Sequence, residues 1–288
     1  MALGCYYSMI LGLPVLADTC APIPEPRTVA AIDGSARATE ISAGTLSTRI
    51  IRVFAHDSTG SEEFRWQANL INFPARLFVA PFGGAVVTMD LWCRSGSEAL
   101  VFYGRSGNVV KRYETAEQDL LLPNEIPRVM RSVSSFWWNV GAFAQFTANG
   151  EYFWLWYPWG RVMVFDARTG ETVDEKSLRQ GGNPGRGVIL ETARVMARSN
   201  APSDRIAAAR LAGWLNGMAV FPILDSLLTD PYYEDDHALN PEEDKWGRRN
   251  GSYSYTFARR YPVRKAAAEE IHIIAGHTEA VVEERVLR

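Results

Sequence analysis

The segment Val101-Phe-Tyr-Gly-Arg-Ser-Gly-Asn-Val-Val110 is matched in outline by Val164-Phe-Asp-Ala-Arg-Thr-Gly-Glu-Thr-Val173 further along the chain. Each copy places β-branched or aromatic residues on both sides of a turn that contains glycine, which is typical of a β-hairpin. A second pair of turn signals, Gly83-Gly84 and Asn149-Gly150, precedes the two copies at a similar spacing. The pattern predicts two successive four-stranded antiparallel meanders.

Strand-like runs continue on both sides of these two units, and we assign residues 48–180 to a β-rich domain. The run from Ile50 to Ile71 predicts a partial third unit. The units resemble the blades of β-propellers, in which four-stranded meanders repeat around an axis. Because a propeller closes with about four or more blades, the resemblance implies an open twisted sheet, a sandwich or a propeller-like fragment, and not a closed ring.

A glycine-rich segment, Gln180-Gly-Gly-Asn-Pro-Gly-Arg-Gly187, follows the β-rich domain. Its four glycines and one proline disfavour both helix and strand, so we expect residues 181–187 to be a linker. A phosphate-binding loop is the alternative because a predicted helix follows, but neither G-K-[ST] nor G-x-G-x-x-G occurs in the required position. We therefore predict a turn between two packed layers.

Residues 188–288 carry the periodicity and capping signals of helices. Two copies of a short motif, Arg205-x-Ala-Ala-Ala and Arg264-x-Ala-Ala-Ala, lie within predicted helices, and the second reads Val263-Arg-Lys-Ala-Ala-Ala-Glu-Glu-Ile271. These helices resemble HEAT repeats, which implies helical hairpins that stack and bury a shared face. A polar insertion, residues 231–260, separates the two copies. The chain is therefore predicted to be α+β, with antiparallel β meanders followed by HEAT-like α-hairpins.

The N-terminal residues predict export. Residues 1–17 contain no charged side chain and end with small residues, so they resemble a secretory signal peptide cleaved after Ala17. We expect a periplasmic or secreted protein; a buried N-terminal strand or helix is the alternative. Residues 18–47 are predicted to be an extended linker because three prolines alternate near their start. Cleavage would leave Cys20 and Cys93, which could form one disulfide or remain two thiols.

Composition narrows the classes of partner. The chain of 288 residues is 47% hydrophobic and 22% charged, as expected for a folded protein. Its net charge of −3 argues against nucleic acid as the main partner, because phosphate binding needs a concentrated basic surface. The N-terminal apolar stretch is too short for a transmembrane span. Because the sequence contains no recognisable motif for a cofactor, a metal or a catalytic nucleophile, we expect none of these.

Aromatic residues are concentrated in the runs Tyr152-Phe-Trp-Leu-Trp-Tyr-Pro-Trp159 and Phe136-Trp-Trp138. One interpretation is a platform on which a sugar ring or a peptide stacks. The candidate platform consists of Trp137, Trp154, Trp156 and Trp159. The interpretation that we favour is a strand buried on both faces, because successive side chains alternate and both faces here are apolar.

The polar insertion is the preferred region of contact with a protein partner, because loops carry function more often than the scaffold beneath them. Its candidate contact residues are Glu234, Asp235, Asp236, Arg248, Arg249, Arg259 and Arg260. Clustered carboxylates could also bind Ca²⁺, but the calcium-loop pattern is absent, and we expect a solvated loop with internal ion pairs. We therefore predict a non-enzymatic binding or scaffold protein. The alternative is a glycan- or ligand-binding protein, or an enzyme, that uses the tryptophan-rich domain.

Overall fold

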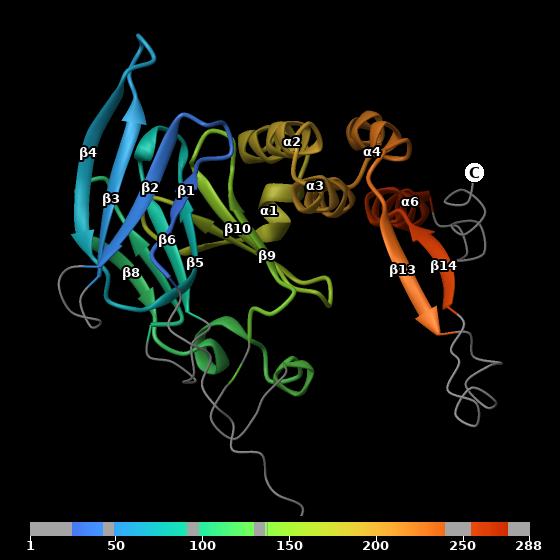
Figure 1. The fold of residues 1–288 in the computed structure, drawn as a ribbon, viewed down its shortest axis with the longest axis horizontal. Helices are drawn as coiled ribbons and strands as arrows, with labels where there is room; N and C mark the ends of the chain where they lie inside the picture. The colour runs from blue at the N-terminus through green and yellow to red at the C-terminus, as the bar shows by residue number, and fades with distance from the viewer. Residues whose placement is uncertain are drawn as a thin grey trace, which may run out of the picture.

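The β-rich part of the chain folds into three successive four-stranded sheets (Figure 1). The computed structural model describes residues 25–42, 49–90, 98–129, 136, 138–239 and 255–275. The first sheet contains β1 (Thr28–Ala30), β2 (Ala36–Ser42), β3 (Arg49–His56) and β4 (Glu62–Asn69), and the second contains β5 (Pro74–Val79), β6 (Val86–Asp90), β7 (Leu100–Tyr103) and β8 (Val109–Tyr113). The third contains β9 (Phe143–Phe146), β10 (Tyr152–Trp156), β11 (Val162–Asp166) and β12 (Thr172–Val173). Within each sheet the strands are antiparallel and follow one another in chain order.

The first sheet corrects the prediction that residues 18–47 form an extended linker. β1 and β2 lie in this segment and complete a whole meander, where the sequence predicts only a partial unit. The inward positions of β2 are Ala36, Ala38 and Glu40, and Glu40 pairs with Arg49 of β3. Because the buried positions hold small and charged residues, the alternation by which a strand is recognised is weak here.

Equivalent hairpin turns of the three sheets carry a glycine with a positive φ angle. In the turn after the third strand these glycines are Gly60, Gly107 and Gly170. Gly107 lies against the backbone of Gln67 in the first sheet, and Gly170 lies against Lys111 in the second, so closely that a Cβ atom at either position would overlap its neighbour. In the second and third sheets, the turn after the third strand therefore packs against the last strand of the preceding sheet. This close approach explains the glycine that the two repeated segments share.

The three sheets stack in a row through two apolar cores. In β7, Val101 and Tyr103 face the first sheet, while Leu100 and Phe102 face the third. All four side chains are buried, so β7 is apolar on both faces, as expected for a strand that is covered on both sides. The outward face of the first sheet carries exposed polar side chains such as Arg52. The described sheets therefore form an open row and not a closed ring.

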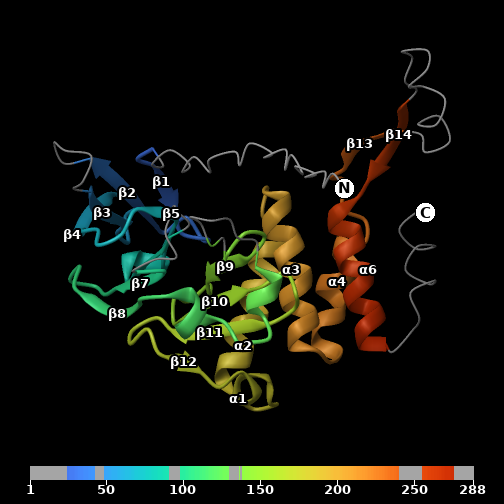
Figure 2. The same ribbon diagram turned by 90° about the horizontal axis from the view of Figure 1, so that it is seen from below.

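Helices cover the far face of the third sheet (Figures 1 and 2). The helices of this layer are α1 (Glu175–Arg179), α2 (Pro184–Ala197), α3 (Pro202–Leu215), α4 (Phe221–Leu227) and α6 (Pro262–Ala275). Shorter helical turns stand at other points of the chain: η1 (Pro81–Gly83), η2 (Ala116–Leu120), η3 (Ile126–Arg128) and η4 (Met218–Val220). α3 packs against α2, α4 and α6. Trp154, Val162 and Val164 of the third sheet belong to the apolar core that the helices form. The fold is therefore α+β, with sheets and helices packed on each other.

The glycine-rich segment is only partly a linker. Its second half forms the first turn of α2, whereas the sequence predicts that residues 181–187 lie outside helices. Asn183 caps α2 by accepting a hydrogen bond from the Gly185 N–H at 2.8 Å, and Pro184 occupies the first helical position. Gly185 is also required by packing, because a Cβ atom there would lie 2.6 Å from Leu178. The capping signals outweigh the low helix propensity of glycine at this position.

The two helices that carry the R-x-A-A-A motifs, α3 and α6, pack side by side (Figure 2). The alanines of both motifs, 207–209 and 266–268, are buried, and such small side chains bring helix axes close together. Arg210 crosses this interface and pairs with Glu269 and with Glu270, the latter at 2.6 Å. The residues that directly follow the two motifs therefore link the two helices.

Candidate functional site

The insertion between the two motif helices contains a two-stranded hairpin, which we call the arm. β13 (Glu234–Leu239) pairs antiparallel with β14 (Tyr255–Arg260), which corrects the expectation of a solvated loop for these residues. The arm extends away from the helices, and its base adjoins α4 and α6 (Figures 1 and 2). The acidic run at the start of β13 has a low β propensity, so these strands are not evident from the sequence.

Asp230 joins the base of the arm to both motif helices. Its carboxylate accepts hydrogen bonds from Arg205 of α3 at 2.6 and 3.1 Å and from the Tyr232 backbone N–H at 2.9 Å. Its backbone carbonyl accepts a hydrogen bond from Arg264 of α6 at 2.7 Å. The arginines of the two R-x-A-A-A motifs therefore meet at one buried residue, directly before the chain enters the arm.

Aromatic rings and arginines surround the base of the arm. The rings of Tyr233 and Tyr261, at the two ends of the arm, lie 6.2 Å apart between centroids. Arg259 lies over the Tyr233 ring at 4.6 Å, and Arg264 lies over the Tyr261 ring at 4.2 Å. Such cation–π contacts stabilise a partly exposed cluster. The cluster holds the two ends of the arm together where they leave the helices.

The predicted contact residues of the arm that the structure describes lie opposite one another. The register of the hairpin places Glu234 opposite Arg260 and Asp235 opposite Arg259, and opposite charges across two strands favour pairing. All four residues are exposed. Glu234 also accepts a hydrogen bond from the Tyr232 hydroxyl at 3.0 Å, and this hydrogen bond raises the pKa of Tyr232. Asp236 lies opposite Ala258 in the same register, while Arg248 and Arg249 lie outside the described residues.

The structure separates the tryptophans of the predicted platform. Trp154 is buried and Trp156 half-buried in the core beneath the helices, where Arg210 lies over the Trp156 ring at 5.9 Å. Trp159 packs against the other core of the third sheet and stacks on Tyr157 at 4.8 Å between centroids. These three tryptophans do not share a surface on which a ligand could stack. Trp137 lies outside the described residues.

Trp159 has a structural partner in the buried carboxylate of Glu125. The indole Nε1 donates a hydrogen bond to Glu125 at 2.7 Å, and Arg161 donates to the second carboxylate oxygen at 2.6 Å. The backbone N–H of Leu122 also donates to Glu125, at 2.8 Å. This network ties the turn after β10 to the segment that follows β8, so packing accounts for the position of Trp159.

Asp230, Tyr233 and Tyr261 are not among the site residues predicted from the sequence. They stand in Asp230-Pro-Tyr-Tyr233 and Arg260-Tyr-Pro262, two segments that bracket the insertion. Proline beside tyrosine at both borders is a signal that the insertion begins and ends at anchored positions. This signal indicates an anchored insertion only when the two borders are known to lie close together in the fold.

Within the described residues, no group of three or more His, Cys, Asp or Glu side chains could hold a metal ion. The helices of those segments include none that is long and apolar enough to cross a membrane. Residues 1–17, Cys20 and Cys93 lie outside the described segments. Comparison with known protein families finds none that matches the chain, and comparison with curated proteins finds no similar sequence.

Proposed function

We propose that the chain is a non-enzymatic binding or scaffold protein that contacts a protein partner through its helical half and the arm. The observation that carries this proposal is the arm itself, whose strands pair with each other and with no third strand among the described residues. A two-stranded hairpin is marginally stable in water, and its edges offer unpaired N–H and C=O groups to another chain. A partner that covers the arm would therefore stabilise it.

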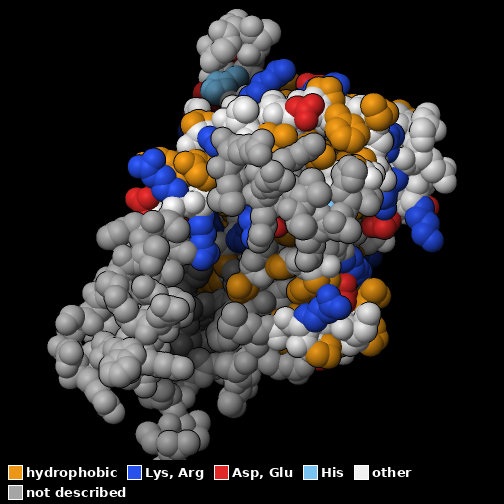
Figure 3. All heavy atoms as spheres, turned by 90° about the vertical axis from the view of Figure 1, so that its right-hand side faces the viewer, with side chains coloured by type: hydrophobic (Ala, Val, Ile, Leu, Met, Phe, Trp, Pro, Cys, Tyr) orange, Lys and Arg blue, Asp and Glu red, His pale blue; other side chains and the backbone are white. Residues whose placement is uncertain are grey.

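The base of the arm is suited to such a contact. Asp230 fixes one end of the arm on α3 and α6, so less conformational freedom is lost when a partner binds. Tyr233 is 44% exposed and lies against Arg259, and Tyr and Arg are enriched among residues that dominate binding energy. Figure 3, which looks onto the helical end, shows hydrophobic, basic and acidic side chains on the parts of this end that the grey atoms leave visible.

The proposal includes the two family resemblances. The helical half is HEAT-like, with α3 and α4 as one hairpin and α6 as the start of the next, and the three sheets are propeller-like blades. The paired motif arginines at Asp230 and the equivalent glycine turns of the sheets support these resemblances. In this view the helices stand next to the third sheet where a further blade would otherwise lie.

Site-specific crosslinking tests the role of the arm. A photoreactive phenylalanine analogue replaces Tyr233 in the full chain, and the control places it at Phe64, an aromatic residue of the first sheet that is 54% exposed. We expect the analogue at position 233 to capture a defined protein that position 64 does not. Replacing residues 231–260 with a short Gly-Ser linker should abolish binding of that purified protein. The proposal fails if both positions capture the same proteins, or if the shortened chain binds the partner as tightly as the full chain.

The proposal also includes export to the periplasm or the exterior, with cleavage after Ala17 and a disulfide between Cys20 and Cys93. The apolar sequence of residues 1–17 supports this part. N-terminal sequencing of the natural protein should find Asp18 as the first residue, and an intact Met1 would refute export. Thiol labelling before and after reduction distinguishes a disulfide from two free thiols.

A further inference from the structure

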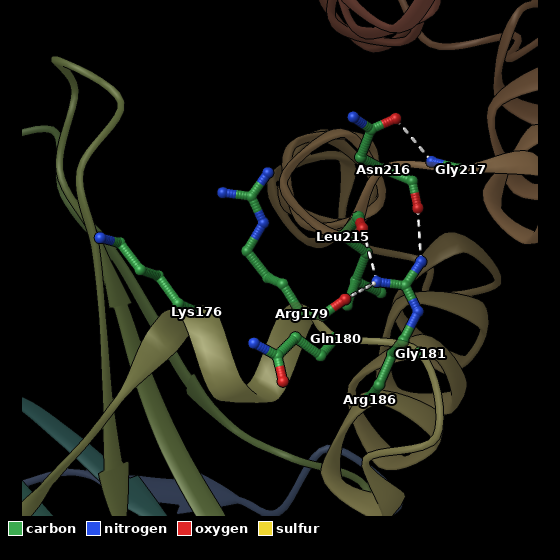
Figure 4. A pocket seen from close by; sticks show the side chains of 8 residues that line it. All are labelled: Lys176, Arg179, Gln180, Gly181, Arg186, Leu215, Asn216 and Gly217. Carbon is green, nitrogen blue, oxygen red and sulfur yellow. Dashed lines mark hydrogen bonds between the residues drawn. The ribbon is translucent and has the colours of Figure 1, made fainter.

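A basic pocket lies where α1, the turn to α2 and the end of α3 meet. It has a volume of about 580 Å³. Its lining residues are Lys176, Arg179, Gln180, Gly181, Arg186, Leu215, Asn216 and Gly217 (Figure 4). Its volume falls within the range of about 300–1,000 Å³ that is usual for small-molecule sites. The pocket lies at the C-terminal end of α3, while the arm is attached at the N-terminal end of that helix through Arg205.

The lining of the pocket is positively charged. Three of its eight residues, Lys176, Arg179 and Arg186, are cationic, and none is acidic. Asp174, the acidic cap of α1, accepts hydrogen bonds from the backbone N–H groups of Lys176 and Ser177 at 3.3 and 3.2 Å. Its carboxylate is therefore engaged with the backbone of α1. The lining itself therefore carries a net positive charge.

Arg186 compensates the electronegative helix ends that would otherwise repel an anion from this pocket. The C-terminal ends of helices are electronegative because their last carbonyl groups have no partner within the helix. Arg186 donates hydrogen bonds to the carbonyl oxygens of Arg179, Leu215 and Asn216 at 2.7, 2.7 and 2.5 Å. One guanidinium thereby satisfies the ends of both α1 and α3, and it holds them together as the wall of the pocket.

The side chains of the other two cations, Lys176 and Arg179, are exposed. Arg179 rests its guanidinium near the Trp214 ring, at 5.6 Å from the centroid, which orients the group and leaves its N–H donors at the edge of the plane. Lys176 and Arg179 extend to the same side of α1, and Arg186 lies on the far side of Arg179 (Figure 4). The carboxamide of Gln180 adds a further polar group to the lining. The cationic groups are therefore spread across the pocket.

We propose that this pocket binds a small molecule with two or more oxyanion groups, as in a diphosphate or a tricarboxylate. Two groups are proposed because Lys176 and Arg179 offer two separate cations, and because one phosphate does not fill a volume of about 580 Å³. The segment has no phosphate-loop motif, so recognition comes from side chains of α1 and not from a cradle of backbone N–H groups. Bidentate hydrogen bonds from Arg179 and a point charge from Lys176 are the contacts that recognise oxyanions.

Isothermal titration calorimetry of the full chain tests the proposal. The probes are pyrophosphate, citrate and inorganic phosphate, in a buffer of low ionic strength. We expect one saturable site for pyrophosphate or citrate, with at least tenfold weaker binding of inorganic phosphate. Lys176→Ala and Arg179→Ala should each weaken binding about tenfold, the effect of losing a charge-assisted hydrogen bond. Higher salt should also weaken it.

Arg168→Ala is the matched control, because Arg168 is an exposed arginine in the turn between β11 and β12, outside the pocket lining. It should leave the affinity unchanged, and circular dichroism should show that all three variants remain folded. Lys176 is exposed, so Lys176→Ala keeps the test valid if Arg179→Ala unfolds. The absence of saturable binding, equal binding of inorganic phosphate, or equal weakening by Arg168→Ala and Lys176→Ala would overturn the proposal.

Discussion

Replacing Asp230 by alanine should destabilise the helical half and release the base of the arm. The side chain of Asp230 is 6% exposed and that of its partner, Arg205, is 13% exposed, so the pair is almost fully buried. Removing one partner of a buried pair costs about 3–5 kcal/mol because the other charge stays buried without compensation. Arg205 keeps hydrogen bonds to the carbonyls of Ser199 and Asn200 at 2.8 and 3.1 Å. We therefore expect a loss near the lower end of that range, about 3 kcal/mol.

Urea denaturation followed by far-UV circular dichroism measures this loss. The control is Asp225→Ala, which removes an exposed carboxylate from α4 and should change the free energy of unfolding by about 0.5 kcal/mol or less. The double variant Arg205→Met/Asp230→Ala should lose less than the sum of the single variants, because no unpaired charge remains. A loss below about 1 kcal/mol for Asp230→Ala, or strict additivity in the double variant, would refute the assigned role of Asp230.

Three further predictions concern other parts of the fold. Gly213→Ala should lower the melting temperature, because its Cβ would overlap the Glu270 carboxylate between α3 and α6, whereas Gly187→Ala in α2, where the space is open, should raise stability by about 0.5–1 kcal/mol. Glu125→Ala removes the acceptor for an indole, an arginine and a backbone N–H, and should cost about 2–3 kcal/mol by denaturant titration; a cost below about 1 kcal/mol would contradict its structural role. Burial raises the pKa of Tyr103 from 10 to about 12, so the fold favours the neutral phenol, and the stability that it contributes below pH 10 is lost between pH 10 and 12. Denaturant titrations across this interval should show a shallower decline for Tyr103→Phe, and an unchanged slope would contradict the assignment.

The sheets are predictable from sequence where their strands are apolar on both faces. β7 and β10 show this, since both are short runs of large apolar residues between turns, and both are buried between two layers. β2 is hard to recognise because its inward positions are alanines and a paired glutamate, and β1 because it is only 3 residues long. The close approach of Gly107 to Gln67 depends on which sheet lies next to which, and a local pattern does not carry that information.

The candidate site was predictable only as a region. The charge of residues 231–260 marks an unusual segment, but the arm depends on pairing between strands of low β propensity. Asp230 acts through Arg205 and Arg264, which are 25 and 34 residues away in sequence. The R-x-A-A-A motif indicates two helices that pack together. It does not show that their arginines converge on one aspartate.

The row of sheets in chain order has a consequence for biosynthesis. Each sheet is built from one continuous stretch of chain and rests on the sheet that the ribosome has already released. The layers can therefore assemble one after another during translation, with each new layer covering the apolar face left open by the last. The third sheet keeps Trp154, Val162 and Val164 uncovered until α2 and α3 emerge. A nascent chain that pauses at this point would present that face to chaperones.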